Sequence, residues 1–155
     1  MEVSGQSLVP VLVRDDDVVA DSPRILDWLE EQYPDPSLYP DDPARRAEVR
    51  IFVEWFNRVW KIAPNRLVEE EDGALAAEMR AALVLFEGLL AGRDYLFGTF
   101  GAADVVAFPF LKYAVFGLPE GDDEPFHAVL VDHQPLRPDS PLRAWAQRVD
   151  AHPRA

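Results

Sequence analysis

The strongest constraint on the fold lies in residues 8–43, where two β-type runs, a turn, an amphipathic segment and a proline-rich stretch follow each other closely. Residues 8–13 and 18–20 are short apolar runs rich in β-branched side chains, and the polar residues 14–17 separate them. Two such runs joined by a short polar turn predict a β-hairpin.

A helix is predicted directly after the hairpin. Ser22 can cap it by accepting a hydrogen bond from a backbone amide, and Pro23 suits the first helical position. Apolar residues then recur at helical spacing, at Ile25, Leu26, Trp28, Leu29 and Tyr33. One face of this helix should therefore be buried.

The composition changes at residues 34–43, which contain four prolines. Proline lacks an amide hydrogen and stiffens the chain, so this segment is expected to be an irregular linker. We therefore predict one domain over residues 1–33, a linker over 34–43 and a second domain over 44–155.

The patterns after the linker are helical. A stripe with steps of three and four predicts a long helix that begins at Pro43, with buried positions at Val49, Phe52, Val53, Phe56, Trp60 and Ala63. A second long helix is predicted over 73–90, with Leu75, Met79, Ala82, Leu83, Phe86 and Leu90 on one side. Residues 117–139 should form an extended crossover or contain only a short helix, and Ser140 should open the last helix.

A further helix should begin at Gly101. With Gly101 as N-cap, Asp104 occupies the third helical position, where its carboxylate can bind the cap amide, and Phe100 and Val105 can form a hydrophobic staple. We expect Pro109 to kink this helix without ending it. This predicts a structural role for Gly101 and Asp104.

The charge and composition exclude several classes of function. The 28 acidic and 15 basic residues give a formal charge of -13, which repels nucleic acid and anionic membranes, so neither is an expected partner. The chain has no cysteine, which excludes disulfides and thiolate sites. No apolar run is long enough for a membrane helix, and we expect a soluble, cytoplasmic protein.

Metal binding is not predicted. His127, Asp132 and His133 lie near the acidic residues 122–124, but their spacing matches no familiar ligand pattern. The sequence also lacks a phosphate-binding glycine loop, a G-x-S-x-G elbow and an H-E-x-x-H motif.

Several short motifs recur in a characteristic order, namely Val9-Pro10, Asp21-Ser22, Trp28 to Pro34, Leu38-Tyr39-Pro40, Gly101 to Asp104, and Pro141-Leu142 with Trp145. In order and spacing the chain resembles the glutathione S-transferase family. The resemblance implies a mostly α fold: a remnant β-β-α of a thioredoxin-like domain, which holds glutathione, followed by an all-helical domain like the family's C-terminal domain. One departure is Gly101, which stands where the family usually has Ser or Thr.

The resemblance also implies site residues. Glutathione, as a substrate, would be bound by Val9, Pro10, Asp21 and Ser22, with Pro10 as the family's cis-proline. A pocket for a small hydrophobic electrophile would be lined by Trp55, Trp60, Tyr113 and Phe116. An aromatic stripe at helical spacing equally fits an ordinary core, and Ser22 as a plain helix cap is the structural alternative for the glutathione site.

The resemblance further indicates a gap. The family's first strand, helix and second strand, with its catalytic Tyr, Ser or Cys, have no counterpart before Val9, and Ser4 and Ser7 lie too close to the strand to replace it. We therefore assign no catalytic residue and expect little conjugating activity from these 155 residues alone.

Two other interpretations remain open. The missing strand would leave an apolar edge that soluble proteins usually cover, which favours a homodimer and a non-catalytic interaction or dimerisation module. Alternatively, the start is misassigned and the natural protein is a complete enzyme.

Overall fold

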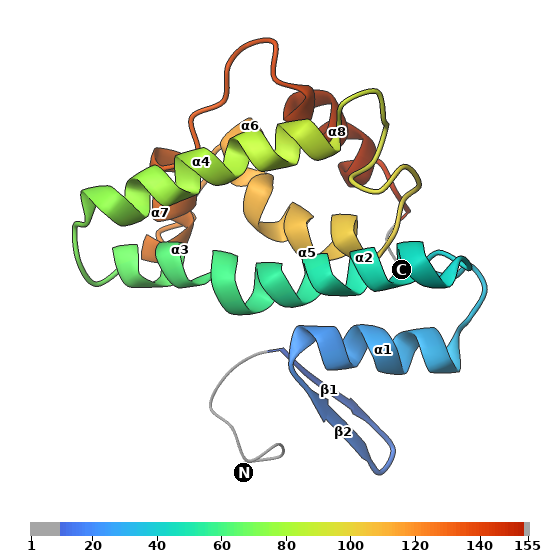
Figure 1. The fold of residues 1–155 in the computed structure, drawn as a ribbon. Helices are drawn as coiled ribbons and strands as arrows, with labels where there is room; N and C mark the ends of the chain where they lie inside the picture. Colours follow the sequence, from blue (N-terminus) through green and yellow to red (C-terminus); the bar gives the residue numbers. More distant parts are fainter. Residues whose placement is uncertain (1–9, 154–155) are drawn as a thin grey trace.

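The protein is described by a computed structural model that covers residues 10–153 (Figure 1). The described part of the chain begins with the expected hairpin, in which β1 (Val11–Arg14) pairs antiparallel with β2 (Asp17–Ala20). Asp15 in the tight turn has φ 51°, and aspartate tolerates this left-handed conformation better than most residues.

Helix α1 (Ser22–Gln32) follows the hairpin and runs alongside the next helix (Figure 1). The predicted N-cap at Ser22 is wrong, because the cap is Asp21 and Ser22 is already helical. Asp21 has φ 81°, and this turn of the backbone follows the end of β2. The helix therefore begins one residue earlier than the position of Pro23 suggested. Its side chain makes no capping hydrogen bond, so the start of α1 lacks a side-chain cap.

The next segment is one long rod, made of α2 (Pro43–Trp55), the π-helical segment η1 (Phe56–Trp60) and α3 (Ile62–Leu67). The carboxylate of Asp42 caps it by accepting a 2.9 Å hydrogen bond from the amide of Arg45. In the π turn the amide of Lys61 donates a 3.2 Å hydrogen bond to the carbonyl of Phe56, five residues earlier. Pro64, one turn further on, cannot donate to the carbonyl of Trp60. The predicted stripe along this rod is buried.

Helix α4 (Gly73–Leu89) crosses above the rod, and α5 (Ala102–Leu111) lies between the two (Figure 1). The remaining helices are α6 (Tyr113–Phe116), α7 (Pro125–Asp132) and α8 (Pro141–Asp150). The core between them is fully buried at Phe56, Phe86, Leu111, Leu130 and Trp145. The predicted fold class is confirmed: mostly helical, with a two-stranded β-β-α remnant at the amino end.

The start of α5 confirms the predicted capping box. Asp104 is 1% exposed, and its carboxylate accepts hydrogen bonds from the amides of Leu96 and Gly101 and from the indole of Trp145, at 3.0, 3.1 and 2.8 Å. Burial raises the pKa of Asp104, an effect that these three donors oppose. The helix continues past Pro109 to Leu111.

Glycine at position 101 has a steric cause. A Cβ there would lie 2.6 Å from the carbonyl oxygen of Leu38, which also accepts a 2.8 Å hydrogen bond from the amide of Ala102. The linker thus lies directly on the start of α5, and a Ser or Thr cap would not fit without a backbone shift.

Two further predictions are confirmed in the carboxyl-terminal part of the described chain. Residues 117–139 contain one short helix, α7, and the hydroxyl of Ser140 caps α8 by accepting a hydrogen bond from the amide of Leu142. None of the helices within residues 10–153 is long and apolar enough to cross a membrane. The division at residues 33 and 43 stays a prediction, although the ends of α1 and the start of α2 fall near it.

Candidate functional site

A cavity of about 450 Å³ lies where α1 faces the rod and α5. Its lining comprises Pro10, then Ser22, Pro23, Ile25, Leu26 and Leu29 of α1, Phe56, Asn57 and Lys61 of the rod, and Val105, Val106, Pro109 and Phe110 of α5. Most of these side chains are hydrocarbon. The polar groups of Ser22, Asn57 and Lys61 are the exceptions, and they come from α1 and the rod.

The amino end of α1 contributes the first polar part of the site. The first amides of a helix have no partner within it, and Pro23 has no amide hydrogen, so the amides of Ser22 and Arg24 are available. The Ser22 hydroxyl has no hydrogen-bond partner among residues 10–153. An amino end with a free hydroxyl suits a carboxylate, because the helix dipole favours negative charge there.

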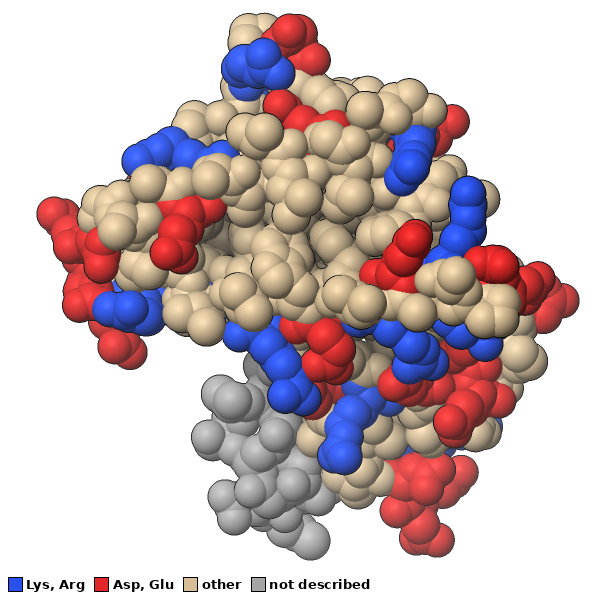
Figure 2. All heavy atoms as spheres, in the orientation of Figure 1, with Lys and Arg blue, Asp and Glu red and all other residues tan. Residues whose placement is uncertain are grey.

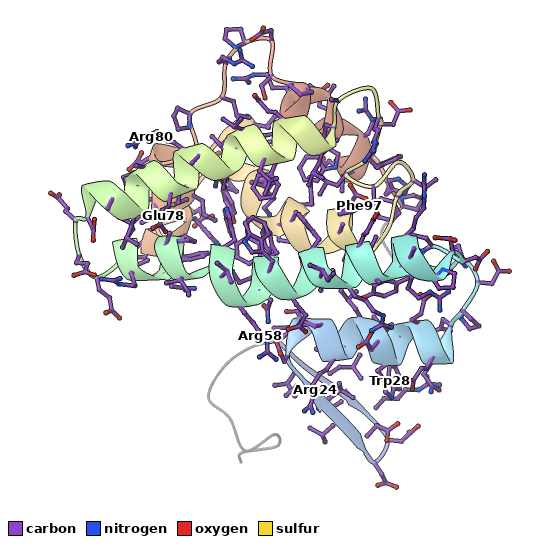
Figure 3. The ribbon with its side chains drawn as sticks, in the orientation of Figure 1. Arg24, Trp28, Arg58, Glu78, Arg80 and Phe97 are labelled. Atoms are coloured by element: carbon purple, nitrogen blue, oxygen red, sulfur yellow. The ribbon has the colours of Figure 1, made fainter. Side chains whose placement is uncertain are left out.

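Asp21 is instead bound to the rod. Its carboxylate accepts a 3.2 Å hydrogen bond from the amide nitrogen of Asn57, whose oxygen accepts a 2.8 Å bond from the ammonium of Lys61. The chain Asp21–Asn57–Lys61 therefore connects the start of α1 to the π turn. Figure 3 shows Arg24 of α1 and Arg58 of the rod near the same end of α1.

Lys61 occupies an unusual environment for a cation. Its ammonium lies 4.7 Å from the ring centre of Phe110 in the cavity wall. Burial lowers the pKa of Lys61, and the negative charge of Asp21 opposes this only in part. A π turn at this point is consistent with function, because such turns occur frequently at functional sites.

The predicted glutathione-binding residues differ in how close they lie to this cavity. Pro10 and Ser22 line it, and Asp21 adjoins it through Asn57. Val9 lies outside the described residues, and so does the Val9–Pro10 peptide. The assignment of these four residues to glutathione therefore stays a prediction.

The four predicted pocket aromatics lie elsewhere and are absent from the described lining of this cavity. Trp60 and Tyr113 are each 5% exposed in the core, where Trp60 stacks on Phe56 and Tyr113 stacks on His127, both with ring centres 4.5 Å apart. Trp55 is partly buried against the same core, and Phe116 is 50% exposed.

The sequence reasoning missed Asn57, Lys61 and Phe110. The signal was present: Lys61 is one of two lysines in the sequence, and it follows Asn57 by one helical turn.

The acidic loop 122–124 and its histidine form a local pair and not a larger cluster. His127 Nδ1 lies 2.8 Å from a carboxylate oxygen of Asp122, and this hydrogen bond lowers the pKa of Asp122. The part of the chain that the structure describes contains no group of three or more side chains arranged to hold a metal ion.

Known proteins share this architecture. Residues 1–37 match the model of the glutathione S-transferase N-terminal domain. Glutathione S-transferase U1 of Arabidopsis thaliana is 27% identical over 117 residues, which cover 73% of this chain and 52% of that protein. The chain spans about half the length of the curated relatives it matches.

Solved structures agree with the sequence matches. A glutathione S-transferase from Rhodospirillum rubrum F11 superposes with a TM-score of 0.67 at 27% identity, covering 97% of this chain and 70% of that one. A glutathione transferase homologue from Burkholderia strain BGR1, solved with bound glutathione, has a TM-score of 0.55 at 25% identity, covering 97% and 78%.

The β-β-α remnant, the all-helical body and the cavity between them define a transferase-type fold with part of a thioredoxin-like domain. In sequence and in fold the chain is similar to proteins of the glutathione S-transferase family.

Proposed function

We propose that the cavity beside α1 is part of a glutathione site, and that the intact protein transfers glutathione to a small hydrophobic electrophile. The observation that carries this proposal is the amino end of α1, which has no side-chain cap, and where the hydroxyl of Ser22, unpaired among residues 10–153, lines a mostly apolar cavity. The reaction class follows from the family, in which a bound thiolate attacks an electrophilic carbon.

Each residue has a proposed part. The Ser22 hydroxyl and the first amides of α1 hold the γ-glutamyl carboxylate, with Asp21 beside them. Val9 and Pro10 hold the cysteinyl part, and the hydrocarbon walls receive the electrophile. Residues 10–153 supply no thiolate-activating group in this scheme, so we assign none, and the scheme uses no metal.

The test is calorimetric titration of the purified protein with glutathione. Ser22→Ala should weaken binding about tenfold, because a hydrogen bond to a carboxylate contributes about 1.5 kcal/mol. Ser22→Thr keeps a hydroxyl and should bind within about threefold of wild type. Glutathione that does not bind to wild type, or that binds equally to Ser22→Ala, would refute the site.

We also propose that the protein acts as a homodimer in the cytoplasm. Ile51 on α2 and Val84 on α4 are 69% and 68% exposed, and Leu85 is exposed beside Val84. Figure 2 shows that the central area of this face of the molecule has no Lys, Arg, Asp or Glu, whereas such residues lie around it. Exposed apolar side chains such as Val84 and Leu85 favour association.

The same surface supports the second candidate function, a non-catalytic dimerisation module. Sedimentation velocity at micromolar concentration distinguishes the outcomes together with the titration: a dimer without glutathione binding favours the module, and a dimer with binding favours the transferase. A monomer at all concentrations would exclude the homodimer. The charge of -13 supports neither nucleic acid nor membrane as a partner.

A further inference from the structure

The ammonium of Lys61 has hydrogen-bond donors that no residue among 10–153 accepts. Its ammonium carries three N–H donors, and one of them is used, in the bond to Asn57. The Phe110 ring beneath it attracts the cation but accepts no strong hydrogen bond. Two donors therefore have no acceptor among residues 10–153.

Lys61 is half-buried, so its ammonium has lost part of its hydration. A counter-charge placed beside it would replace the hydration that is lost. Asp21 is the nearby negative group, but its carboxylate is hydrogen-bonded to Asn57, which lies between it and Lys61. Its charge raises the pKa of Lys61 without a direct hydrogen bond. The other cavity walls near Lys61 are hydrocarbon, so they offer no replacement for the lost water.

We propose that Lys61 is the counter-ion for a carboxylate carried on an apolar ligand in this cavity. The inference rests on the proposed function, because it deepens the ligand chemistry of the same cavity. Lys61 is then a specificity-determining residue that selects acids over neutral molecules of the same shape.

Lys61 is the one charged residue among the described residues that line the cavity, and this determines the ligand class. A single carboxylate balances its charge and can accept both free donors with its two oxygens. A phosphate dianion would bring a second charge and a third oxygen that no other cation lining the cavity matches. The carboxylate can come from glutathione itself or from the second ligand.

Matched probes test the proposal on the full chain. We would titrate 4-phenylbutanoate and its neutral amide, 4-phenylbutanamide, into wild type and Lys61→Met, with Lys61→Arg as the variant that keeps the cation. The acid should bind Lys61→Met at least tenfold more weakly than wild type, while the amide should be unchanged. Lys61→Arg should retain most of the affinity for the acid.

Lys112 provides the control, because it is the other lysine and also lies over an aromatic ring, 4.9 Å from the centre of Tyr113, outside the cavity lining. Lys112→Met should leave the affinity for the acid unchanged. Equal losses in the two methionine variants, or an acid that binds wild type no better than its amide, would overturn the proposal.

A second measurement needs no variant. Because burial lowers the pKa of Lys61, the affinity of wild type for the acid should fall as the pH rises, and the fall should begin at a lower pH than a lysine in water would give. The affinity for the amide should stay constant over the same range. An acid affinity that falls no more with pH than the affinity for the amide would also overturn the proposal.

Glutathione as a third probe distinguishes the two sources of the carboxylate. If Lys61→Met weakens glutathione binding as well, the carboxylate is that of glutathione; if only the acid is affected, it belongs to the second ligand. If wild type binds the acid through Lys61 but does not bind glutathione, the proposed function fails while the role of Lys61 stands.

Discussion

The helical body and the hairpin unit differ in how they are stabilised. The body, from α2 to α8, has a core of fully buried side chains that include Phe56, Phe86 and Trp145. In the hairpin unit, residues 10–33, Pro23 and Leu26 are the buried side chains, and neither strand has one. An isolated two-stranded hairpin is marginally stable in water, so the hairpin unit depends on the body.

The polar contacts between the two regions are partly exposed. Arg50 of α2 forms a 2.8 Å ion pair with Asp27 of α1, and the side-chain amide of Asn57 donates a 3.2 Å hydrogen bond to the carboxylate of Asp21. Exposed ion pairs each contribute about 1 kcal/mol or less, whereas Leu26 packs into the common core. The candidate site therefore lies beside the less stable region.

The largest effect is expected in the body, from Asp104→Ala. The change removes the acceptor for three donors and leaves them buried, at about 1–3 kcal/mol each. We expect a loss of at least about 3 kcal/mol in the free energy of unfolding, measured by urea denaturation followed by circular dichroism.

Asp132→Ala is the matched control for that loss, because Asp132 is exposed at the end of α7. It should change the unfolding free energy by less than about 0.5 kcal/mol. If the two alanine variants had equal free energies of unfolding, the buried carboxylate of Asp104 would not stabilise the body. The proposed difference in stabilisation between the body and the hairpin unit would then be wrong.

An intermediate effect is expected in the hairpin unit, from Leu26→Ala. Truncating this buried side chain should cost about 2–3 kcal/mol, and the cost should fall on local opening of the unit because the core of the body remains intact. Hydrogen exchange followed by mass spectrometry should show faster exchange in α1 and β2 and unchanged exchange in α4 and α8.

Ile51→Ala is the control for Leu26→Ala, since Ile51 is an exposed apolar residue of α2. It should leave the exchange of α1 unchanged. Faster exchange spread evenly over the whole chain in Leu26→Ala would mean that the hairpin unit and the body unfold as one cooperative unit.

The parts of the fold that were predicted from sequence depend on local physics. The stripe of the rod, the start of its helix at Pro43 and the start of the last helix at Ser140 need only residues within a turn or two of one another. Ser22 was misplaced as a cap because Asp21 takes a positive φ, which a sequence pattern does not reveal for a residue other than glycine.

The site was harder to predict, because it forms only when distant segments pack together. The cavity requires α1 to lie against the rod, and the bond between Asp21 and Asn57 joins residues far apart in the sequence. An aromatic stripe identifies a buried face but does not distinguish core from pocket. Gly101 likewise looks like a weak cap until Leu38 is seen against it.

The smallest effect is expected where the two regions meet, at Tyr39. This side chain is 4% exposed, and burial first, then the charge of Asp27, raises its pKa to about 12. In the unfolded chain the phenol ionises near pH 10, so the folded state resists ionisation and wild type should lose about 2 kcal/mol of stability between pH 10 and 12. Tyr39→Phe cannot ionise and should lack this loss, whereas Tyr33→Phe, at an exposed position, should keep it. Parallel stability curves for wild type and Tyr39→Phe would show that the junction between hairpin unit and body is open to water.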